Sequence, residues 1–387
     1  MYKYICNLNC MGCHACSTIC PKQCITMKTD KEGFYYPQID SSLCINCGLC
    51  EKVCPIINPI KINKTDSDID AYAAYTKDLD VRLRSSSGGL FTEIASYIIE
   101  NGGIVFGAAL NSDLLVEHIS VETIEDLEKL RGSKYVQSTI GNTYKQAKEE
   151  LDKGRLVLFT GTPCQINGLY SYLRKDYDNL LTQDIICHGV PSPLVWKQYL
   201  KYIENQTGSK PTNISFRDKK NGWQSYSLVF CLENGDEYIE SSKDSLFMKA
   251  FLSDLCLRPS CYSCKFKTKI RISDFTLADF WGINNVLPEF NDNNGTSLLL
   301  INSSKAHTIL EKIKDRIVLK QVDLDTALKY NPSAYKSAVM PKKRHAFMKN
   351  IQSMPFDEVV RKYTKRSKFK ILLSKIKNKI YRILKKQ

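Results

Sequence analysis

Hydrophobic positions alternate, from residue 71 onward, between short strand-like runs and longer segments with a helical period. The helical period is clearest where Leu90, Ile94, Tyr97 and Ile98 fall on one face. Strands that alternate with helices are typical of an α/β domain with a mostly parallel sheet. Residues 214–240 have the pattern of an antiparallel meander, so we expect a mixed sheet. The predicted strands are 71–75, 104–110, 156–160 and 184–187, and the predicted helices are 89–100, 144–153, 193–204 and a short one after Cys164.

Cysteines are concentrated at the N-terminus, where ten of the sixteen fall within the first 54 residues. Eight of them form two copies of the pattern C-x2-C-x2-C-x3-C-P, in residues 10–21 and 44–55. Three cysteines at this spacing let a short loop hold three corners of a cubane cluster, and in two-cluster ferredoxins the fourth ligand crosses from the other run. We therefore predict two 4Fe-4S clusters. Their ligands would be Cys10, Cys13, Cys16 and Cys54 in one, and Cys44, Cys47, Cys50 and Cys20 in the other.

Zinc and disulfides are the alternatives for these cysteines. Structural zinc sites usually show pairs of cysteines with a longer gap between pairs, whereas each run here has a third and a fourth cysteine. A disulfide framework suits a secreted chain, but the first residues lack the basic and long apolar regions of a signal peptide. Cys6 and Cys24 are surplus to the eight, and we expect them to be ordinary buried or free thiols.

The length of 387 residues allows a ferredoxin-type module and either one large α/β domain or two smaller ones. Residues 55–68 are rich in Pro, Asn, Asp and Ser, which favours a linker. We predict a small α+β bacterial-ferredoxin-like domain over 1–58, a linker over 59–70, an α/β domain over 71–335 and a tail over 336–387. No run approaches 18 apolar residues, so we expect no membrane-spanning helix and a cytoplasmic protein.

The formal charge of +14 is a property of the tail. Residues 361–387 contain twelve Lys and Arg and no Asp or Glu, which leaves 43 basic and 41 acidic side chains elsewhere. Apolar residues from Phe369 to Leu384 recur at steps of three and four, with lysines between them, which predicts a basic amphipathic helix. Such a helix can pack on protein or lie peripherally on the inner membrane surface. Nucleic acid is not expected as a partner, because the tail has few aromatic residues to stack on bases.

Two loops of the α/β region could hold an anionic cofactor. Residues 84–89 end at a predicted helix start, where free N–H groups and the helix dipole favour phosphate; a plain serine cap with a glycine turn is the alternative. Residues 131–138 place two cations among hydroxyls, and a solvated basic turn is the alternative there. Neither loop is a Walker A or GxGxxG sequence. The candidate cofactor-binding residues are Ser86, Ser87, Gly88, Gly89 and Lys134.

Four later cysteines could meet at one edge of the predicted sheet. Cys164 and Cys187 each follow an apolar strand-like run, and the C-terminal ends of parallel strands share an edge. Cys261 and Cys264 form a C-x2-C pair that could add two thiolates. Four thiolates there would make a third cluster, with zinc and isolated free thiols as alternatives.

Several dispersed motifs between residues 162 and 282 occur together. They are Thr-Pro-Cys-Gln at 162–165, a cysteine after the next strand, and the C-x2-C pair followed by Ser-Asp-Phe-Thr-Leu-Ala-Asp-Phe-Trp-Gly at 273–282. In these motifs the chain resembles, over residues 70–335, the family of coenzyme F420 (deazaflavin) hydrogenase/dehydrogenase beta subunits. The resemblance implies an iron-sulfur flavoprotein with FAD and a flavin site that includes the helix start at Ser87–Gly89. It also implies a 4Fe-4S cluster bound by Cys164, Cys187, Cys261 and Cys264, with Cys256 as an alternative to Cys187.

The sequence is most similar to a branch of that family encoded with surface-polysaccharide genes, often beside polysaccharide pyruvyl transferases. We therefore predict an oxidoreductase in which clusters exchange electrons with a flavin, and the flavin reduces or oxidises a small organic substrate or cofactor. A low-potential carrier or a redox partner protein would supply or accept the electrons. The alternative is a non-catalytic electron-transfer or accessory subunit that docks on a glycan-modifying enzyme. No catalytic acid or base is assigned, because His188 is expected to be an ordinary hydrogen-bonded histidine and Trp281 a core residue.

Overall fold

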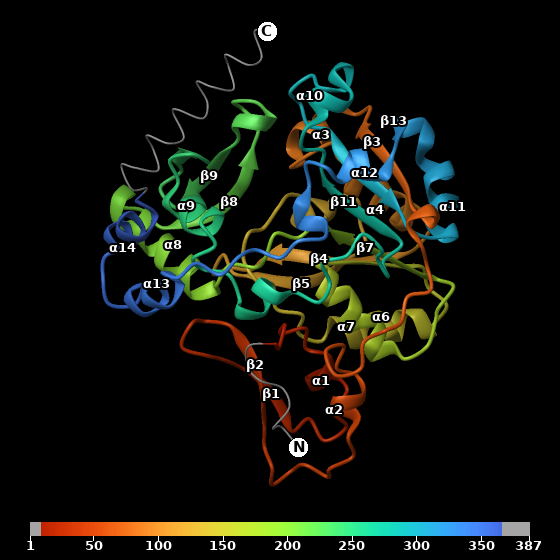
Figure 1. The fold of residues 1–387 in the computed structure, drawn as a ribbon, viewed down its shortest axis with the longest axis horizontal. Coiled ribbons are helices and arrows are strands. Elements are labelled where there is room, and N and C mark those ends of the chain that lie inside the picture. The colour runs from red at the N-terminus through yellow and green to blue at the C-terminus, as the bar shows by residue number, and fades with distance from the viewer. Residues whose placement is uncertain (1–8, 366–387) are drawn as a thin grey trace.

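The computed structural model describes residues 9–365. The main sheet is the largest sheet in these residues (Figure 1). It has eight strands in the order β13-β3-β12-β11-β7-β6-β4-β5. The four strands β11, β7, β6 and β4 are parallel neighbours, and all the flanking pairs are antiparallel. The strands are β3 (Asp70–Thr76), β4 (Ile104–Leu110), β5 (Val116–Val121), β6 (Val157–Thr160), β7 (Leu180–Ile185), β11 (Phe275–Asp279), β12 (Ser297–Ile301) and β13 (Ile317–Val322).

Helices cover both faces of this sheet. On one face α4 (Leu90–Glu100), α5 (Leu127–Leu130) and α11 (Ser304–Ile313) bury their apolar sides against the strands. On the other face α6 (Thr143–Asp152) and α7 (Pro163–Leu173) pack against the centre. Three further helices are short: α3 (Leu79–Arg84) and α12 (Leu324–Leu328), which contact β3, and α10 (Ile283–Val286). The result is a three-layer α/β arrangement with a mixed sheet.

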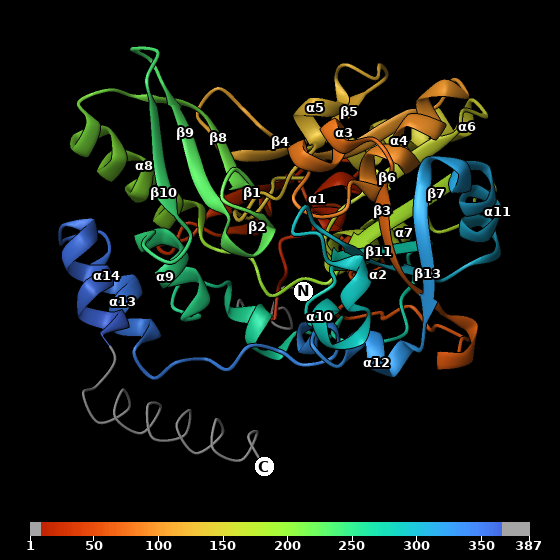
Figure 2. The ribbon, with the colours of Figure 1, turned by 90° about the horizontal axis from the view of Figure 1, so that it is seen from above.

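A second hydrophobic core lies beside the main sheet (Figure 2). A three-stranded antiparallel sheet of β8 (Pro211–Asp218), β9 (Ser227–Leu232) and β10 (Glu237–Ser241) packs there against helices. Trp196 is fully buried at its centre among aromatic rings, which contribute much of the buried apolar area. The helices are α8 (Pro193–Thr207), α9 (Leu246–Leu252), α13 (Arg344–Asn350) and α14 (Phe356–Thr364).

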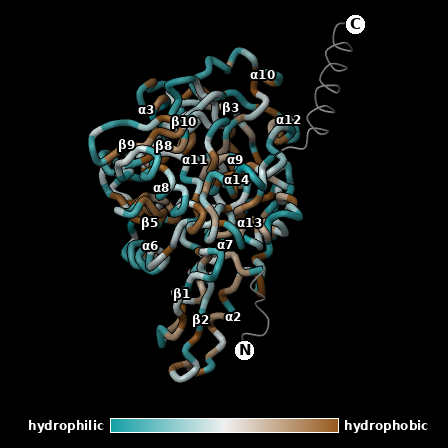
Figure 3. The backbone as a smooth tube through the Cα atoms, turned by 90° about the vertical axis from the view of Figure 1, so that its left-hand side faces the viewer, coloured by the Kyte–Doolittle hydropathy of each residue, from teal (hydrophilic) through white to brown (hydrophobic). Residues whose placement is uncertain are grey.

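The N-terminal region forms a narrow extension from the body (Figure 3). It contains α1 (Ala15–Thr18), the hairpin of β1 (Ile25–Thr29) and β2 (Tyr35–Ile39), and α2 (Leu49–Lys52). Ala15 and Val53 of this region are buried in the same core as α6 and α7, so the extension rests on the helix layer of the main domain. The chain is therefore a mixed α/β domain preceded by a small ferredoxin-like region.

Most predicted elements are confirmed to within three residues, and two predictions are wrong. The predicted strand at 184–187 lies too far along the chain, because β7 spans Leu180–Ile185. The helix predicted after Cys164 begins before it, at Pro163, and has eleven residues. A capping box between Thr162 and Gln165, with proline at the first helical position, explains this early start. The antiparallel meander predicted over residues 214–240 is confirmed and spans 211–241, but it forms a separate sheet and is not part of the main one.

Within residues 9–365, no helix combines the length and apolar character that a membrane crossing requires. The predicted basic helix between Phe369 and Leu384, and Cys6, lie outside the described residues.

Candidate iron-sulfur and cofactor sites

The first predicted cysteine set comes together where the N-terminal region meets the body. Burial, together with the neighbouring charges of Cys10 and Cys54, raises the pKa of the Cys16 thiol to about 12. Burial likewise raises the pKa of Cys13 strongly, with contributions from the same thiols. Thiols that disfavour each other's ionisation in a buried space need a cationic centre to become thiolates, as metal binding provides.

The second predicted set surrounds a small cavity within the N-terminal extension. Cys20, Cys44, Cys47 and Cys50 all line this cavity of about 20 Å³. Cys24, which the sequence pattern left as a surplus thiol, lines it too, with its Sγ 3.3 Å from that of Cys20. The structure thus places a fifth thiol beside the four predicted ligands.

The third predicted set lines a cavity of about 40 Å³ at the C-terminal edge of the main sheet. Cys164 is the second residue of α7, Cys187 follows β7, and Cys261 and Cys264 come from one loop. Burial raises the pKa of Cys164 well above its usual value, and the charges of the other three thiols add to this rise. Among residues 9–365, no group of three or more His, Cys, Asp or Glu side chains is arranged to hold a single metal ion.

Cys256, the alternative to Cys187, lies elsewhere. It is fully buried in the second hydrophobic core, and burial raises the pKa of its thiol to about 12. It does not line the cavity that Cys164, Cys187 and Cys261 share. The backbone carbonyl oxygen of Cys256 accepts a hydrogen bond from Ser192 N at 2.9 Å. In the structure, Cys187 rather than Cys256 faces the other three thiols.

A larger cavity of about 490 Å³ opens beside the third cysteine set. It lies at the C-terminal ends of β6, β7 and β11, the edge where parallel sheets place ligands. Its volume falls within the range of small-molecule and cofactor pockets. Cys187, His188, Gly189 and Val190 line both this cavity and the smaller cysteine-lined one, so the two spaces share a wall.

The two loops predicted to hold an anion meet at this cavity. Ser133 N donates a hydrogen bond to Ser86 Oγ at 2.7 Å, which joins the loops directly. The turn that contains Ser87 is held from the other side, because Gly88 N donates to Ser297 Oγ at 2.9 Å. Ser86, Ser87 and Gly89 line the cavity, whereas Gly88 lies against strand backbone.

The helix start in this loop is open. Gly89, in the left-handed conformation with φ of 85°, precedes α4, and no side chain caps the helix. Thr92 N donates to the Gly89 carbonyl oxygen at 3.0 Å, and the N–H groups of Leu90 and Phe91 are available to an anion at this end of the cavity. Lys134 also lines the cavity, but its ammonium donates to the carbonyl oxygens of Leu130, Arg131 and Gly132 at 2.9 to 3.2 Å. Because of these three bonds, the lysine shapes the loop as well as lining the cavity. Burial lowers the Lys134 pKa to about 7.

Arg217 of β8 is a cavity residue that the sequence pattern did not single out. Its side chain is 3% exposed and forms an ion pair with Asp279. Its Nε and Nη2 have no hydrogen-bond partner within the described chain, and neither does Oε1 of Gln183, which also lines the cavity. Buried polar atoms without partners are costly, so they favour a bound polar ligand. No motif surrounds Arg217, so only the packing of β8 against the main domain reveals it.

Aromatic and imidazole groups complete the lining. Trp281 is 38% exposed and stacks on Trp223 with ring centres 5.5 Å apart, so it is not the core residue that was expected. His118 is buried, with Nδ1 2.6 Å from Ser138 Oγ and Nε2 3.0 Å from the Thr160 carbonyl oxygen. Burial lowers the His118 pKa to about 4, which keeps the ring neutral.

His188 is hydrogen-bonded, as expected. Its Nε2 lies 2.6 Å from Asp254 Oδ1, and its Nδ1 lies 3.4 Å from Ser333 Oγ. Asp274 and Asp279 lie just before and at the end of β11 and bind different partners, so they do not form a carboxylate pair.

Three family models match the chain. The two models that describe the N-terminal and C-terminal parts of the coenzyme F420 hydrogenase/dehydrogenase beta subunit match residues 71–143 and 154–327, respectively. A "4Fe-4S dicluster domain" model matches residues 9–56, which include both N-terminal cysteine runs.

Similar proteins occur in Methanocaldococcus and Methanosarcina. The chain is 32% identical over 195 residues to a coenzyme F420-dependent sulfite reductase of Methanocaldococcus jannaschii, a match that covers 49% of this chain and 29% of that protein. It is 26% identical over 165 residues to a subunit of the F(420)H(2) dehydrogenase of Methanosarcina mazei, which covers 40% of this chain and 46% of that protein. The chain thus spans less than half the length of either relative. A chain of the F420-reducing [NiFe] hydrogenase complex from Methanosarcina barkeri aligns with 67% of this chain and 89% of its own length, at 17% identity and a TM-score of 0.46.

Proposed function

The chain belongs to the family of coenzyme F420 hydrogenase/dehydrogenase beta subunits, and we propose that it is an iron-sulfur flavoprotein oxidoreductase. The N-terminal region would hold two 4Fe-4S clusters, the third cysteine set would hold another, and the larger cavity would hold FAD. Electrons would pass between the clusters and a small organic substrate or cofactor through the flavin.

The observation that carries this proposal is the wall shared by the two cavities. Cys187 lines both of them, so a redox cofactor in the larger cavity would lie beside the third cysteine set. Met11 and Ile56, which are neighbours of the first cysteine set, line the smaller cavity as well. Three of the four proposed redox sites are therefore neighbours in space, in the order first cysteine set, third cysteine set and larger cavity.

The residues of the larger cavity fit a flavin nucleotide. The uncapped start of α4 beside Ser86 and Ser87 suits a phosphate, and Arg217 and Gln183 offer unpaired donors and an unpaired acceptor. When bound, a flavin supplies the exchange between one-electron and two-electron transfer. The chain's own contribution is to hold the cofactor and to keep His118 neutral in the wall.

The relatives' names suggest the first substrate to test. The sulfite reductase and the dehydrogenase are both named for coenzyme F420, so we propose reduced and oxidised F420 as the first assay pair. Nicotinamides and sugars are the next. The comparisons lend no support to a role beside a polysaccharide-modifying enzyme or at a membrane, and both remain predictions from the sequence.

The test is the iron-to-flavin ratio of the chain purified without oxygen. The proposal predicts about twelve iron atoms and about one flavin per chain, from three clusters of four iron atoms. Cys164→Ser should lose about four iron atoms and keep those of the N-terminal region. Cys231→Ser is the matched control, because Cys231 lies on β9 away from both cavities, and it should keep the full content. About eight iron atoms and no flavin, even after addition of FAD, would refute the flavoprotein assignment.

An electron-transfer subunit without its own substrate is the second candidate. One relative is itself named as a subunit of a dehydrogenase, and it favours assembly with redox partner proteins. Flavin-coupled turnover of F420 by the isolated chain would exclude this candidate. A chain with full iron and flavin that turns over only with a partner would support it.

A further inference from the structure

Arg258 links the first cysteine set to the third. Its guanidinium donates to the carbonyl oxygens of Cys10 at 2.8 Å and of Tyr35 at 2.9 Å, and to Gln137 Oε1 at 2.9 Å. The first two acceptors belong to the N-terminal region, and one of them is the backbone of a predicted ligand. Arg258 itself lies three residues before Cys261, and its carbonyl oxygen accepts a hydrogen bond from Cys261 N at 2.9 Å. One residue thus contacts the ligand loops of both sets.

The N-terminal region and the body approach each other closely at Arg258. Gly12 has a φ of 66°, and a Cβ at this position would lie 2.7 Å from Gln137 Nε2 and 2.9 Å from Arg258 Nη1. Gln137 Nε2 in turn donates to the carbonyl oxygen of Met11 at 3.3 Å. Met11 and Arg258 both line the cavity of the third set. The loop between Cys10 and Cys13 therefore forms part of the wall around the third set.

Arg258 is a buried cation whose hydrogen-bond acceptors are all neutral. It is 1% exposed, and no carboxylate within residues 9–365 forms an ion pair with it. Its guanidinium lies 4.3 Å from the centre of the Tyr36 ring, which is also uncharged. A buried charge without a counter-charge is strongly unfavourable. A 4Fe-4S cluster held by four thiolates carries net negative charge. Clusters on either side would therefore supply the counter-charge for the Arg258 guanidinium.

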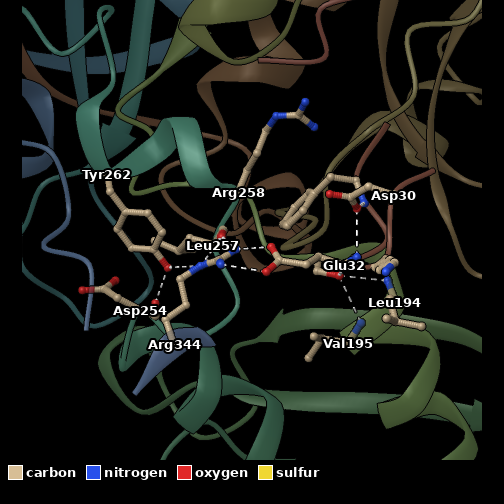
Figure 4. A network of polar contacts seen from close by, with 12 residues as sticks. Asp30, Glu32, Leu194, Val195, Asp254, Leu257, Arg258, Tyr262 and Arg344 are labelled. Carbon is tan, nitrogen blue, oxygen red and sulfur yellow. Dashed lines mark hydrogen bonds and ion pairs between the residues drawn. The ribbon is translucent and has the colours of Figure 1, made fainter. Parts of the chain in front are cut away.

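Arg344 forms another main polar contact between the N-terminal region and the body, and unlike Arg258 it has a carboxylate partner. Arg344 Nη1 donates to Glu32 Oε1 at 2.9 Å, and Figure 4 shows this ion pair beside Arg258, whose side chain extends away from it. Arg344 has its carboxylate within the interface and does not line either cavity. It therefore offers a matched control for the loss of an interface arginine.

We propose that Arg258 is a positioning residue for electron transfer between the first and third cysteine sets, and that its charge raises the reduction potentials of the clusters beside it. This inference rests on the proposed function, since it assumes clusters at both sets. Each transfer oxidises one cluster by one electron and reduces the other by one electron, and no bond forms or breaks. Arg258 would hold the two ligand loops at a fixed separation and stabilise the added negative charge in each reduced state.

The test is an anaerobic dithionite titration of the full chain, followed by EPR. Cys164→Ser identifies the signal of the third cluster by its loss. Arg258→Met should lower the reduction potentials of the first and third clusters. The equilibrium constant for reduction should fall at least tenfold, which corresponds to 59 mV for a one-electron couple. Arg344→Gln should leave both potentials unchanged. Arg258→Met with full iron and wild-type potentials would overturn the inference.

Two further variants keep the test decisive if Arg258→Met does not fold. Arg258→Lys retains the charge but cannot reach all three acceptors, so it should keep the potentials and weaken the magnetic interaction between the two clusters in EPR. Gln137→Met, which removes one acceptor and the contact to Met11, should behave in the same way. A wild-type interaction in both variants would overturn the positioning role. A wild-type chain with only eight iron atoms would overturn the proposed function, and the inference with it.

Discussion

Gly168→Ala tests whether the first cysteine set packs directly on α7. In an exposed helix, replacement of glycine by alanine stabilises the helix by about 1 kcal/mol. Gly168 is buried within α7, and an added Cβ would lie 2.7 Å from Tyr144 Oη, 3.0 Å from Cys13 Cβ and 3.2 Å from Cys13 Sγ. Overpacking of this kind costs about 1 to 3 kcal/mol.

Tyr144 cannot easily move aside. It is fully buried, and its hydroxyl donates to the carbonyl oxygen of Gln165 at 2.7 Å. Displacement of the ring would cost about a further 1 kcal/mol for the lost hydrogen bond. The helical gain is therefore outweighed, and we expect a net destabilisation of about 1 to 3 kcal/mol.

The assay is anaerobic urea unfolding, followed by far-ultraviolet circular dichroism and by the visible absorption of the clusters. Gly168→Ala should lower the unfolding midpoint, with loss of cluster absorption at or before the loss of helix. Ser171→Ala is the control on the same helix: its hydroxyl has no hydrogen-bond partner within the described chain, so its removal should leave the midpoint unchanged or raise it. A Gly168→Ala chain at least as stable as wild type, with full iron, would refute the close contact of Cys13 with α7.

Three further predictions follow from single sites. Cys187→Ser should lose about four iron atoms whereas Cys256→Ser keeps them all, as iron analysis would show; the reverse would make Cys256 the ligand. Glu32→Gln should destabilise the chain by about 2 to 3 kcal/mol, because Arg344, 6% exposed, loses its counter-charge. Urea unfolding of the Glu32 variant, an Arg344 variant and the double variant would give the coupling energy of the pair, and additive effects would contradict the coupling. The His118 pKa of about 4 lies below its value in the unfolded chain. The contribution of this site to the free energy of unfolding, on the order of 3 kcal/mol, is therefore present above pH 6.5 and lost as the pH falls from 6.5 to 4. His118→Gln should reduce that loss in a pH series of unfolding midpoints, and an unchanged slope would contradict the assignment.

The parts of the fold that the sequence predicted well are those with strong apolar periodicity. Strands β3, β4 and β6 and helices α4 and α6 lie within one or two residues of their predicted positions. Most of the residues that these elements bury are apolar, with Thr76, Glu93 and Ser96 among the exceptions, so the pattern of the sequence and the burial in the structure largely agree.

Strand β7 shows why the prediction fails elsewhere. Its residues Thr182, Gln183 and Asp184 are polar yet buried, and an apolar pattern cannot identify them. Partners from distant segments satisfy two of the three: Asp184 Oδ1 accepts from Thr276 Oγ1 at 2.6 Å, and Thr182 N donates to Asp274 Oδ2 at 2.8 Å. Burial raises the pKa of Asp184, and a buried ion pair with an arginine opposes that rise. These interactions are tertiary, so local propensity carries no signal of them.

The candidate site residues also differ in whether the sequence carries a signal of them. The two N-terminal cysteine sets were predicted from the spacing that cluster ligation imposes on the chain. The third set was predicted from cysteines that follow strands, a C-x2-C pair and the family resemblance. Arg217, Gln183 and His118 could not be predicted, because they reach the larger cavity from separate elements and share no spacing. Their significance appears only as burial and unpaired atoms, which are properties of the folded chain.

The interface between the N-terminal region and the body depends on residues outside the matched family domains. The family models end at residue 327, whereas Arg344, which binds Glu32, and Gln352, which donates to the Lys31 carbonyl oxygen at 2.5 Å, follow that point. Gly33, in the turn that carries these contacts, lies against the start of α8, where an added Cβ would be 2.5 Å from Leu194 Cβ. A ferredoxin that exchanged electrons by transient docking would not need a buried ion pair and a glycine fitted to its partner. These contacts from the segment after residue 327 hold the N-terminal region against the body.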